Sequence, residues 1–277
     1  LIINLIIASI IPFLIWGPFL PDLIVSLSAL FFLSYVLKNK KFYFFKNKPL
    51  IIFFIFCIYC ILLSVFVAED MMLSFESSLF YFRIGVFSCF IWYLIDRDKS
   101  ILTYFYYTLV LCFLALVIDG YIQYFTGINL VGFKILDNRV SSFFGDELIM
   151  GSYLSRLFPL LFALFLIKKK KKNEIYFIGI LFILTDVLIF ISGERASFFF
   201  LNLSTVFITI LIKEYQKFRL LTFVIAIGCV LILSLNSSIT NERMFKSPAE
   251  DMGLIKSSNE PVIFSKVHDS LIRTAYN

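Results

Sequence analysis

The chain has 277 residues, of which 60% are hydrophobic and 16% are charged, and its mean hydropathy is +0.93. A soluble domain of this length has too little interior to bury so much apolar surface, so the composition excludes an ordinary water-soluble protein. The formal net charge is +6, but the basic residues stand in short segments between apolar runs. This placement indicates membrane topology and excludes nucleic acid as the partner.

Apolar runs close to the roughly 20 residues that cross about 30 Å of hydrocarbon recur along the chain. We therefore expect an all-α fold, a polytopic transmembrane helical bundle over residues 1–235, with the lipid bilayer as its main surroundings. Residues 236–277 are expected to begin a large periplasmic loop. The nine expected spans are 3–19, 21–37, 49–67, 77–95, 100–118, 152–167, 174–192, 196–212 and 219–235.

The loop charges predict an orientation. Fifteen of the 25 Lys and Arg residues fall in four alternate loops, namely 38–48, 96–99, 168–173 and 213–219. The positive-inside rule makes these loops cytoplasmic, which predicts a multi-pass protein of the bacterial inner membrane with a cytoplasmic N-terminus and a periplasmic active face. The sequence lacks an initiator Met and ends without a closing span, so we expect a fragment that is truncated within the periplasmic loop.

Arginines are the most informative polar residues on the expected outer side. Four of them are candidates for binding a lipid-linked pyrophosphate: Arg83, Arg139, Arg156 and Arg195. A guanidinium offers a planar fork of donors that matches phosphate oxygens, and it stays charged at membrane depth. The alternative is that Arg83, Arg156 and Arg195 form structural ion pairs with the carboxylates Asp119, Asp186 and Glu194.

His268 is the only histidine and lies in the last outer segment. Its ordinary pKa near the working pH makes it a candidate general base. One histidine excludes a histidine-rich metal site, and Asp146 and Glu147 are adjacent, which points their carboxylates apart. The five cysteines all lie in apolar runs, where we interpret them as packing residues without a redox or zinc role. We expect no metal and no cofactor.

Three segments, taken in order, resemble the O-antigen ligase and O-antigen polymerase family of bacterial envelope glycan assembly. The first runs from Gln123-Tyr-Phe-Thr-Gly-Ile-Asn-Leu130 through Arg139-Val-Ser-Ser-Phe-Phe-Gly145 to Gly151-Ser-Tyr-Leu-Ser-Arg-Leu-Phe-Pro159. The second is Ile191-Ser-Gly-Glu-Arg-Ala-Ser197, which is similar to an S-x-x-R-[GA] turn between two spans. The third is His268-Asp-Ser-Leu-Ile-Arg-Thr-Ala275, similar to a stretch of the family's large periplasmic loop.

The resemblance implies a metal-independent membrane glycosyltransferase of lipopolysaccharide or other surface polysaccharide biosynthesis. Its donor would be an undecaprenyl-pyrophosphate-linked oligosaccharide, and its acceptor a hydroxyl on the periplasmic side. Arg139 and Arg195 would hold the pyrophosphate, supported by Arg156 and Arg83, and Arg195 would stabilise the leaving group while His268 takes the acceptor's proton. A polymerase is slightly favoured over a ligase, and a chain-length regulator or a flippase is the expected protein partner.

Two other functions stay open at this stage. A lipid-linked oligosaccharide flippase or another polytopic transporter would show charges deep in several spans or broken helices at the membrane midplane. A non-catalytic membrane scaffold would not need the outer arginines and the histidine together.

Overall fold

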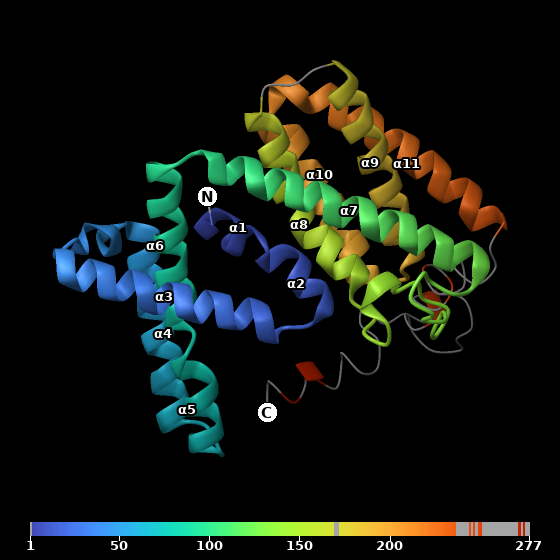
Figure 1. Ribbon diagram of the computed structural model, residues 1–277. Coiled ribbons are helices and arrows are strands. Elements are labelled where there is room, and N and C mark those ends of the chain that lie inside the picture. Colours follow the sequence, from blue (N-terminus) through green and yellow to red (C-terminus); the bar gives the residue numbers. More distant parts are fainter. Residues whose placement is uncertain are drawn as a thin grey trace. The chain divides into compact units, whose positions relative to one another are not determined.

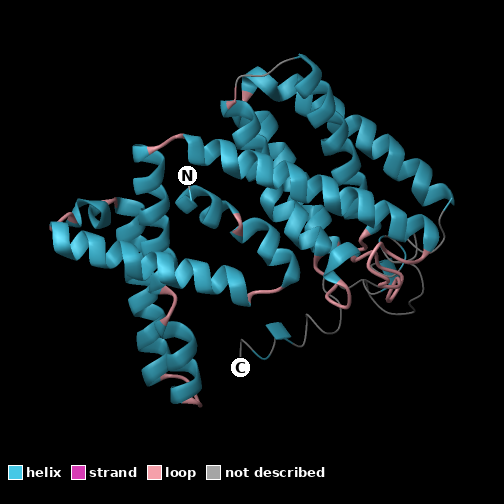
Figure 2. Cartoon of the chain, viewed as in Figure 1, coloured by secondary structure: helices cyan, strands magenta, loops and turns pink. Residues whose placement is uncertain are grey.

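A computed structural model describes residues 2–168 and 172–236, together with isolated residues at 244, 246, 249–250, 271–272 and 274. The described chain is built from helices and loops, with two isolated β-bridges in one loop (Figure 2). The predicted all-α class is therefore confirmed. The chain divides into two compact units, Leu1–Thr108 and Leu109–Asn277, and the boundary falls within α7 (Figure 1).

Seven helices of the described chain are long and apolar enough to cross a membrane. They are α3 (Phe19–Asn39), α4 (Lys48–Phe66), the segment Met71–Arg97 that contains α5 and α6, α7 (Ser100–Thr126), α8 (Met150–Ile167), α9 (Lys172–Ile191) and the segment Lys213–Leu235 that contains most of α11 (Gln216–Asn236). The most apolar of them, α4, is also the least buried. An apolar helix that faces outward is stable only in lipid, so the chain is a multi-pass membrane protein.

The helices differ from the nine expected spans at four places. The expected outer segment 68–76 and the start of the span 77–95 contain α5 (Met71–Leu79), which two turn residues separate from α6. The run 3–19 is divided into α1 (Ile2–Ala8) and α2 (Ile10–Trp16), and α2 ends at Gly17, whose φ of 140° is closed to most L-residues. The run 196–212 forms α10 (Arg195–Leu211), a shorter apolar helix of 17 residues. The expected span 100–118 continues as α7 to Thr126.

In the first unit, α3 packs against α6 (Phe82–Arg97) around a common core, and the two helices cross in Figure 1. Ser26, the eighth residue of α3, pairs with Arg83 at the start of α6, while Phe32 contacts Phe90 and Tyr35 contacts Tyr93 further along both helices. The short helix η1 (Phe42–Lys46) closes this core with a fully buried phenylalanine at position 44. Aromatic side chains fill the gap because they bury large areas and pack edge to face.

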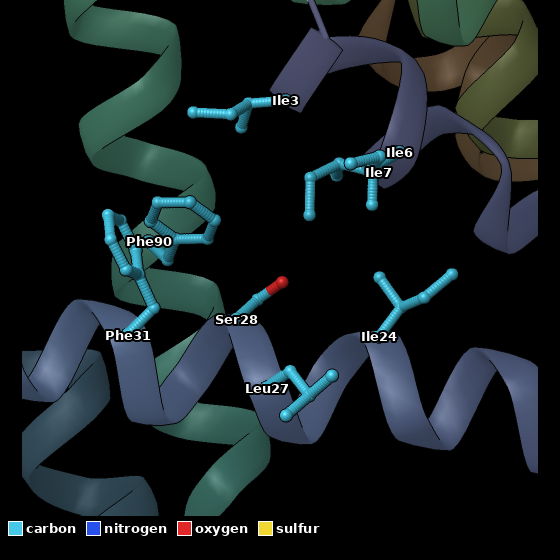
Figure 3. A pocket seen from close by; sticks show the side chains of 8 residues that line it. All are labelled: Ile3, Ile6, Ile7, Ile24, Leu27, Ser28, Phe31 and Phe90. Atoms are coloured by element: carbon cyan, nitrogen blue, oxygen red, sulfur yellow. The ribbon is translucent and has the colours of Figure 1, made fainter.

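Two apolar grooves flank α3 in the first unit, each with a volume of about 310 Å³. In the first groove, residues of α1 face Ile24 and Leu27 of α3, with Phe31 and Phe90 beside them (Figure 3). Ser28 is the one polar side chain of that lining (Figure 3). The second groove lies on another face of α3, against α6, and includes Arg83.

In the second unit, α8, α9, α10 and α11 pack on one another, and the second half of α7 lies against α9. The Cβ position of Gly120 on α7 is 2.9 Å from a methyl group of Leu188, so a larger residue would require that side chain to move. The hydroxyl of Tyr121 donates to the carbonyl of Leu184 at 3.0 Å. Phenylalanines from three helices fill the interior at positions 158, 162, 165, 182 and 218.

A buried ion pair joins α9 and α11 within this unit. Arg219 is fully buried, and its two terminal nitrogens donate to the two carboxylate oxygens of Asp186 at 2.7 and 3.2 Å. The guanidinium also donates to Thr205 of α10 at 2.5 Å and lies 4.4 Å from the ring centre of Phe158. Arg219 was expected in the cytoplasmic loop 213–219; it instead points into the bundle, and it is no evidence for the sidedness of that loop.

Candidate functional site

The segment between α7 and α8 is anchored to a buried carboxylate. Asp119, near the end of α7, is fully buried and accepts three hydrogen bonds: from the backbone N–H of Leu130 at 2.8 Å, the hydroxyl of Ser142 at 2.6 Å and the amide of Asn129 at 3.2 Å. Such donors compensate a carboxylate for the water it has lost. Asp119 therefore holds both ends of the loop against the helix.

Gln123 acts one helical turn further along α7. Its side-chain oxygen accepts from the backbone N–H groups of Ser141 and Ser142 at 3.0 and 2.7 Å. Ser142 has a φ of 51°, an uncommon conformation for a residue other than glycine. The hydrogen bonds from its backbone N–H to Gln123 and from its hydroxyl to Asp119 hold Ser142 in this conformation. Strained residues persist where the surrounding structure fixes them in this way.

A tight hairpin turn places Arg139 within this segment. Leu136 and Arg139 form an antiparallel bridge, and the two residues between them, Asp137 and Asn138, have φ of 49° and 57°. Two consecutive residues with positive φ are the signature of a type I′ turn, which Asp and Asn tolerate. The turn directs Arg139 back toward the bundle.

Glu194 connects three parts of the same end of the second unit. Its carboxylate accepts from the backbone N–H groups of Gly151 and Ser152 at 2.7 and 2.9 Å, and from the hydroxyl of Ser197 at 2.8 Å. The first two belong to the N-terminus of α8, where exposed N–H groups and the helix dipole favour an anion. We call this arrangement the Glu194 hub: Glu194, the α8 start, Ser197 and Arg139.

Gly151 makes the hub possible because it has no side chain. A Cβ at this position would stand 2.5 Å from the hydroxyl of Ser192 and 2.9 Å from a carboxylate oxygen of Glu194. Real Cβ atoms essentially never approach other atoms so closely. A glycine is therefore required for the carboxylate to reach the backbone of α8.

Arg139 is held by the hub and by backbone carbonyls. It donates to the carbonyls of Leu148 at 2.6 Å and of Ser192 at 3.2 Å, and it lies 3.6 Å from the carboxylate of Glu194. Its side chain keeps only 16% of its exposure. Arg139, which the sequence analysis did not assign to an ion pair, therefore contacts Glu194 and two backbone carbonyls.

The other candidate residues lie in different settings. Arg195 begins α10 directly after Glu194 and is exposed. Arg156 is exposed on α8, one turn beyond Ser152, and therefore on the same side of that helix as the hub. Arg83 belongs to the first unit, where it pairs with Asp22 at 2.6 Å. His268 lies outside the described residues, and its predicted role stays a prediction.

Sequence reasoning missed three residues that organise this site: Gln123, Asn129 and Gly151 were quoted within motifs but given no role. The sequence did contain a signal for Gln123: Asp119 and Gln123 are four residues apart, which places both polar side chains on the same face of a helix. Nothing local could show that Glu194 caps α8, because 43 residues separate Glu194 from Gly151.

Within the part of the chain that the structure describes, no three His, Cys, Asp or Glu side chains gather as a metal site. Comparison with known proteins adds no relative: no family model, no curated protein and no solved structure matches the chain. The candidate site is therefore described by its own geometry alone.

Proposed function

We propose that the chain acts as a membrane glycosyltransferase that moves a glycan from an undecaprenyl-pyrophosphate donor to an acceptor hydroxyl at the periplasmic face of the bacterial inner membrane. The reaction is the one performed by O-antigen polymerases and ligases, and we favour the polymerase. The observation that carries the proposal is the Glu194 hub, because it brings Arg139 against the turn that contains Arg195 and places Arg156 one turn along the adjoining helix.

The roles of the arginines follow from their surroundings. Arg195 and Arg156 are exposed, and a guanidinium matches the geometry of pyrophosphate oxygens. Arg139 is mostly buried against Glu194 and two carbonyls, so it positions the turn and adds positive potential. In the transfer, the bond between the sugar and the pyrophosphate breaks as the acceptor oxygen bonds to the sugar. The arginines stabilise the charge on the leaving pyrophosphate, and His268 takes the acceptor proton.

The test is the glycan profile of cells that carry full-length variants in place of the natural protein. Arg195→Ala, Arg139→Ala and His268→Ala should each remove long-chain glycan while protein levels stay normal. Arg195→Lys keeps the charge but loses the bidentate fork, so it should remove most of the long chains as well. Lys134→Ala is the matched control, since Lys134 is an exposed cation in the same outer segment. Normal glycan ladders in all three alanine variants would overturn the proposal.

One observation favours a second function, a lipid-linked oligosaccharide flippase. The pair Asp186–Arg219 is buried between spanning helices, and charges in such positions often mark a transport pathway. The two functions predict different deletion phenotypes. Loss of a transferase leaves lipid-linked repeat units on the outer face, where an added glycosidase digests them, whereas loss of a flippase leaves them protected inside.

A further inference from the structure

We propose that the groove between α3 and α6 binds a phosphatidylethanolamine molecule, with one acyl chain along the groove and the headgroup on Arg83 and Asp22. The groove lies in the first unit, and the inference does not depend on the proposed glycan transfer. Arg83 and Asp22 belong to the first unit, and the residues of the Glu194 hub belong to the second.

The groove has the shape of a chain site. Its volume is about 310 Å³, near the lower end of ordinary ligand pockets. On α3 it is lined by Ser26, Ala29, Leu30 and Leu33, a stripe that advances two turns along the helix, or about 10 Å. Apart from Ser26 and Arg83 the lining is apolar. Such a groove on a membrane-spanning helix is open to the acyl chains around it.

The polar end of the groove lies where a headgroup would be. Asp22 is in the first turn of α3, a helix of 21 residues and therefore about 31 Å long, which matches the hydrocarbon thickness. Arg83 is the second residue of α6 and reaches Asp22 at 2.6 Å and the hydroxyl of Ser26 at 2.8 Å. The length of α3 is sufficient to span the hydrocarbon, and a spanning placement puts its first turn at the boundary with the headgroups.

Arg83 and Asp22 can still bind a negatively charged and a positively charged group, respectively. Within residues 2–168 and 172–236, the guanidinium of Arg83 makes two hydrogen bonds, so three of its five N–H groups remain for a phosphate. Asp22 is the more exposed partner, with 57% of its side chain accessible, and only one of its oxygens is engaged by Arg83. A phosphate needs the cation and an ammonium needs the carboxylate.

Charge complementarity therefore selects the occupant. Phosphatidylethanolamine carries a phosphate and a primary ammonium a few atoms apart, and the ammonium donates hydrogen bonds to a carboxylate. Phosphatidylcholine has the same charges but no N–H donor, and phosphatidylglycerol has no cation for Asp22. The first groove, on the opposite side of α3, has the same volume but no charged residue, so it should accept a chain without preferring a headgroup (Figure 3).

The experiment is native mass spectrometry of the full-length protein with added phosphatidylethanolamine, phosphatidylglycerol or phosphatidylcholine. The wild type should retain phosphatidylethanolamine about tenfold more tightly than phosphatidylcholine, the effect of one or two charge-assisted hydrogen bonds. Arg83→Gln should abolish the preference. Asp22→Asn should reverse it toward phosphatidylglycerol, because Arg83 then stands alone; a misfolded variant would not produce this reversal.

A matched pair of groove variants tests the chain site. Leu30→Trp fills the proposed groove and should lower phosphatidylethanolamine retention, whereas Leu27→Trp fills the groove of Figure 3 and should not. The two leucines are 60% and 57% exposed, so the substitutions are comparable in their surroundings. Equal retention of all three lipids, preference of the wild type for phosphatidylglycerol, or displacement of phosphatidylethanolamine by added polyprenyl phosphate would each overturn the proposal.

Discussion

The buried pair of Asp186 and Arg219 allows a quantitative prediction. We consider Asp186→Leu, Arg219→Met and the double variant. Asp186 is 2% exposed and Arg219 is fully buried, and they share two hydrogen bonds of 2.7 and 3.2 Å. Each single substitution leaves one charge buried without its counterion, while the double substitution leaves an apolar interface of similar volume.

The expected magnitudes follow from burial. Removing one partner of a buried pair costs about 3–5 kcal/mol of the free energy of unfolding, whereas replacing both partners is often neutral. The coupling energy of the cycle should therefore be about 3 kcal/mol or more. Lys168 and Glu174 provide a control in the same unit, since their pair at 3.3 Å is partly exposed. Glu174→Gln should cost at most about 1 kcal/mol.

The assay is equilibrium unfolding of the full-length protein in mixed micelles, performed on the wild type, both single variants, the double variant and the control. A double variant that is more stable than either single variant supports the buried pair. If the two single effects simply add, the carboxylate and the guanidinium do not interact in the protein, and the packing of α11 on α9 would have to be redrawn.

Two further substitutions test the end of the second unit that carries the Glu194 hub. In Asp119→Asn, a single acceptor oxygen faces three donors, so the substitution should lower the free energy of unfolding by about 1–3 kcal/mol and raise hydrogen exchange across residues 127–149. The control Asp146→Asn, at an exposed position of the same segment, should leave exchange unchanged. Equal effects of the two substitutions would contradict the anchoring role of Asp119. Gly151→Ala should destabilise the protein by about 1–3 kcal/mol because the added Cβ would stand 2.5 Å from the hydroxyl of Ser192. The control Gly228→Ala in α11, where nothing lies within 4 Å of the added Cβ, should be neutral or slightly stabilising. Equal melting temperatures of the two variants would contradict the requirement for glycine at position 151.

The helical class could be predicted from the sequence because bilayer-length apolar runs are a local property. The C-terminal limit of α7 could not be predicted in this way. Asp119 and Gln123 look like a helix end when only hydropathy is considered, yet the helix continues to Thr126. Their polar groups are satisfied by backbone N–H groups of the loop that follows, and such a contact is invisible until the loop is folded.

Long-range partners explain the other differences. Arg219 stands at the edge of an apolar run, next to basic loop residues, so loop charge was the natural interpretation. Its carboxylate partner is 33 residues away on another helix. The candidate arginines were identified by residue type and by the predicted orientation, but only the folded chain separates the mostly buried Arg139 from the exposed Arg195.

The central claim is that exposed arginines beside the Glu194 hub support glycan transfer, and reconstitution tests it most directly. Full-length protein in lipid nanodiscs would receive an undecaprenyl-pyrophosphate-linked glycan and an acceptor, and the released undecaprenyl pyrophosphate and extended glycan would be measured together. We predict that the wild type forms the two products in equal amounts and that Lys134→Ala is as active as the wild type. Arg195→Lys should lower the rate of product formation on the order of 10²-fold. No product from the wild type, or full activity of Arg195→Lys, would contradict the account.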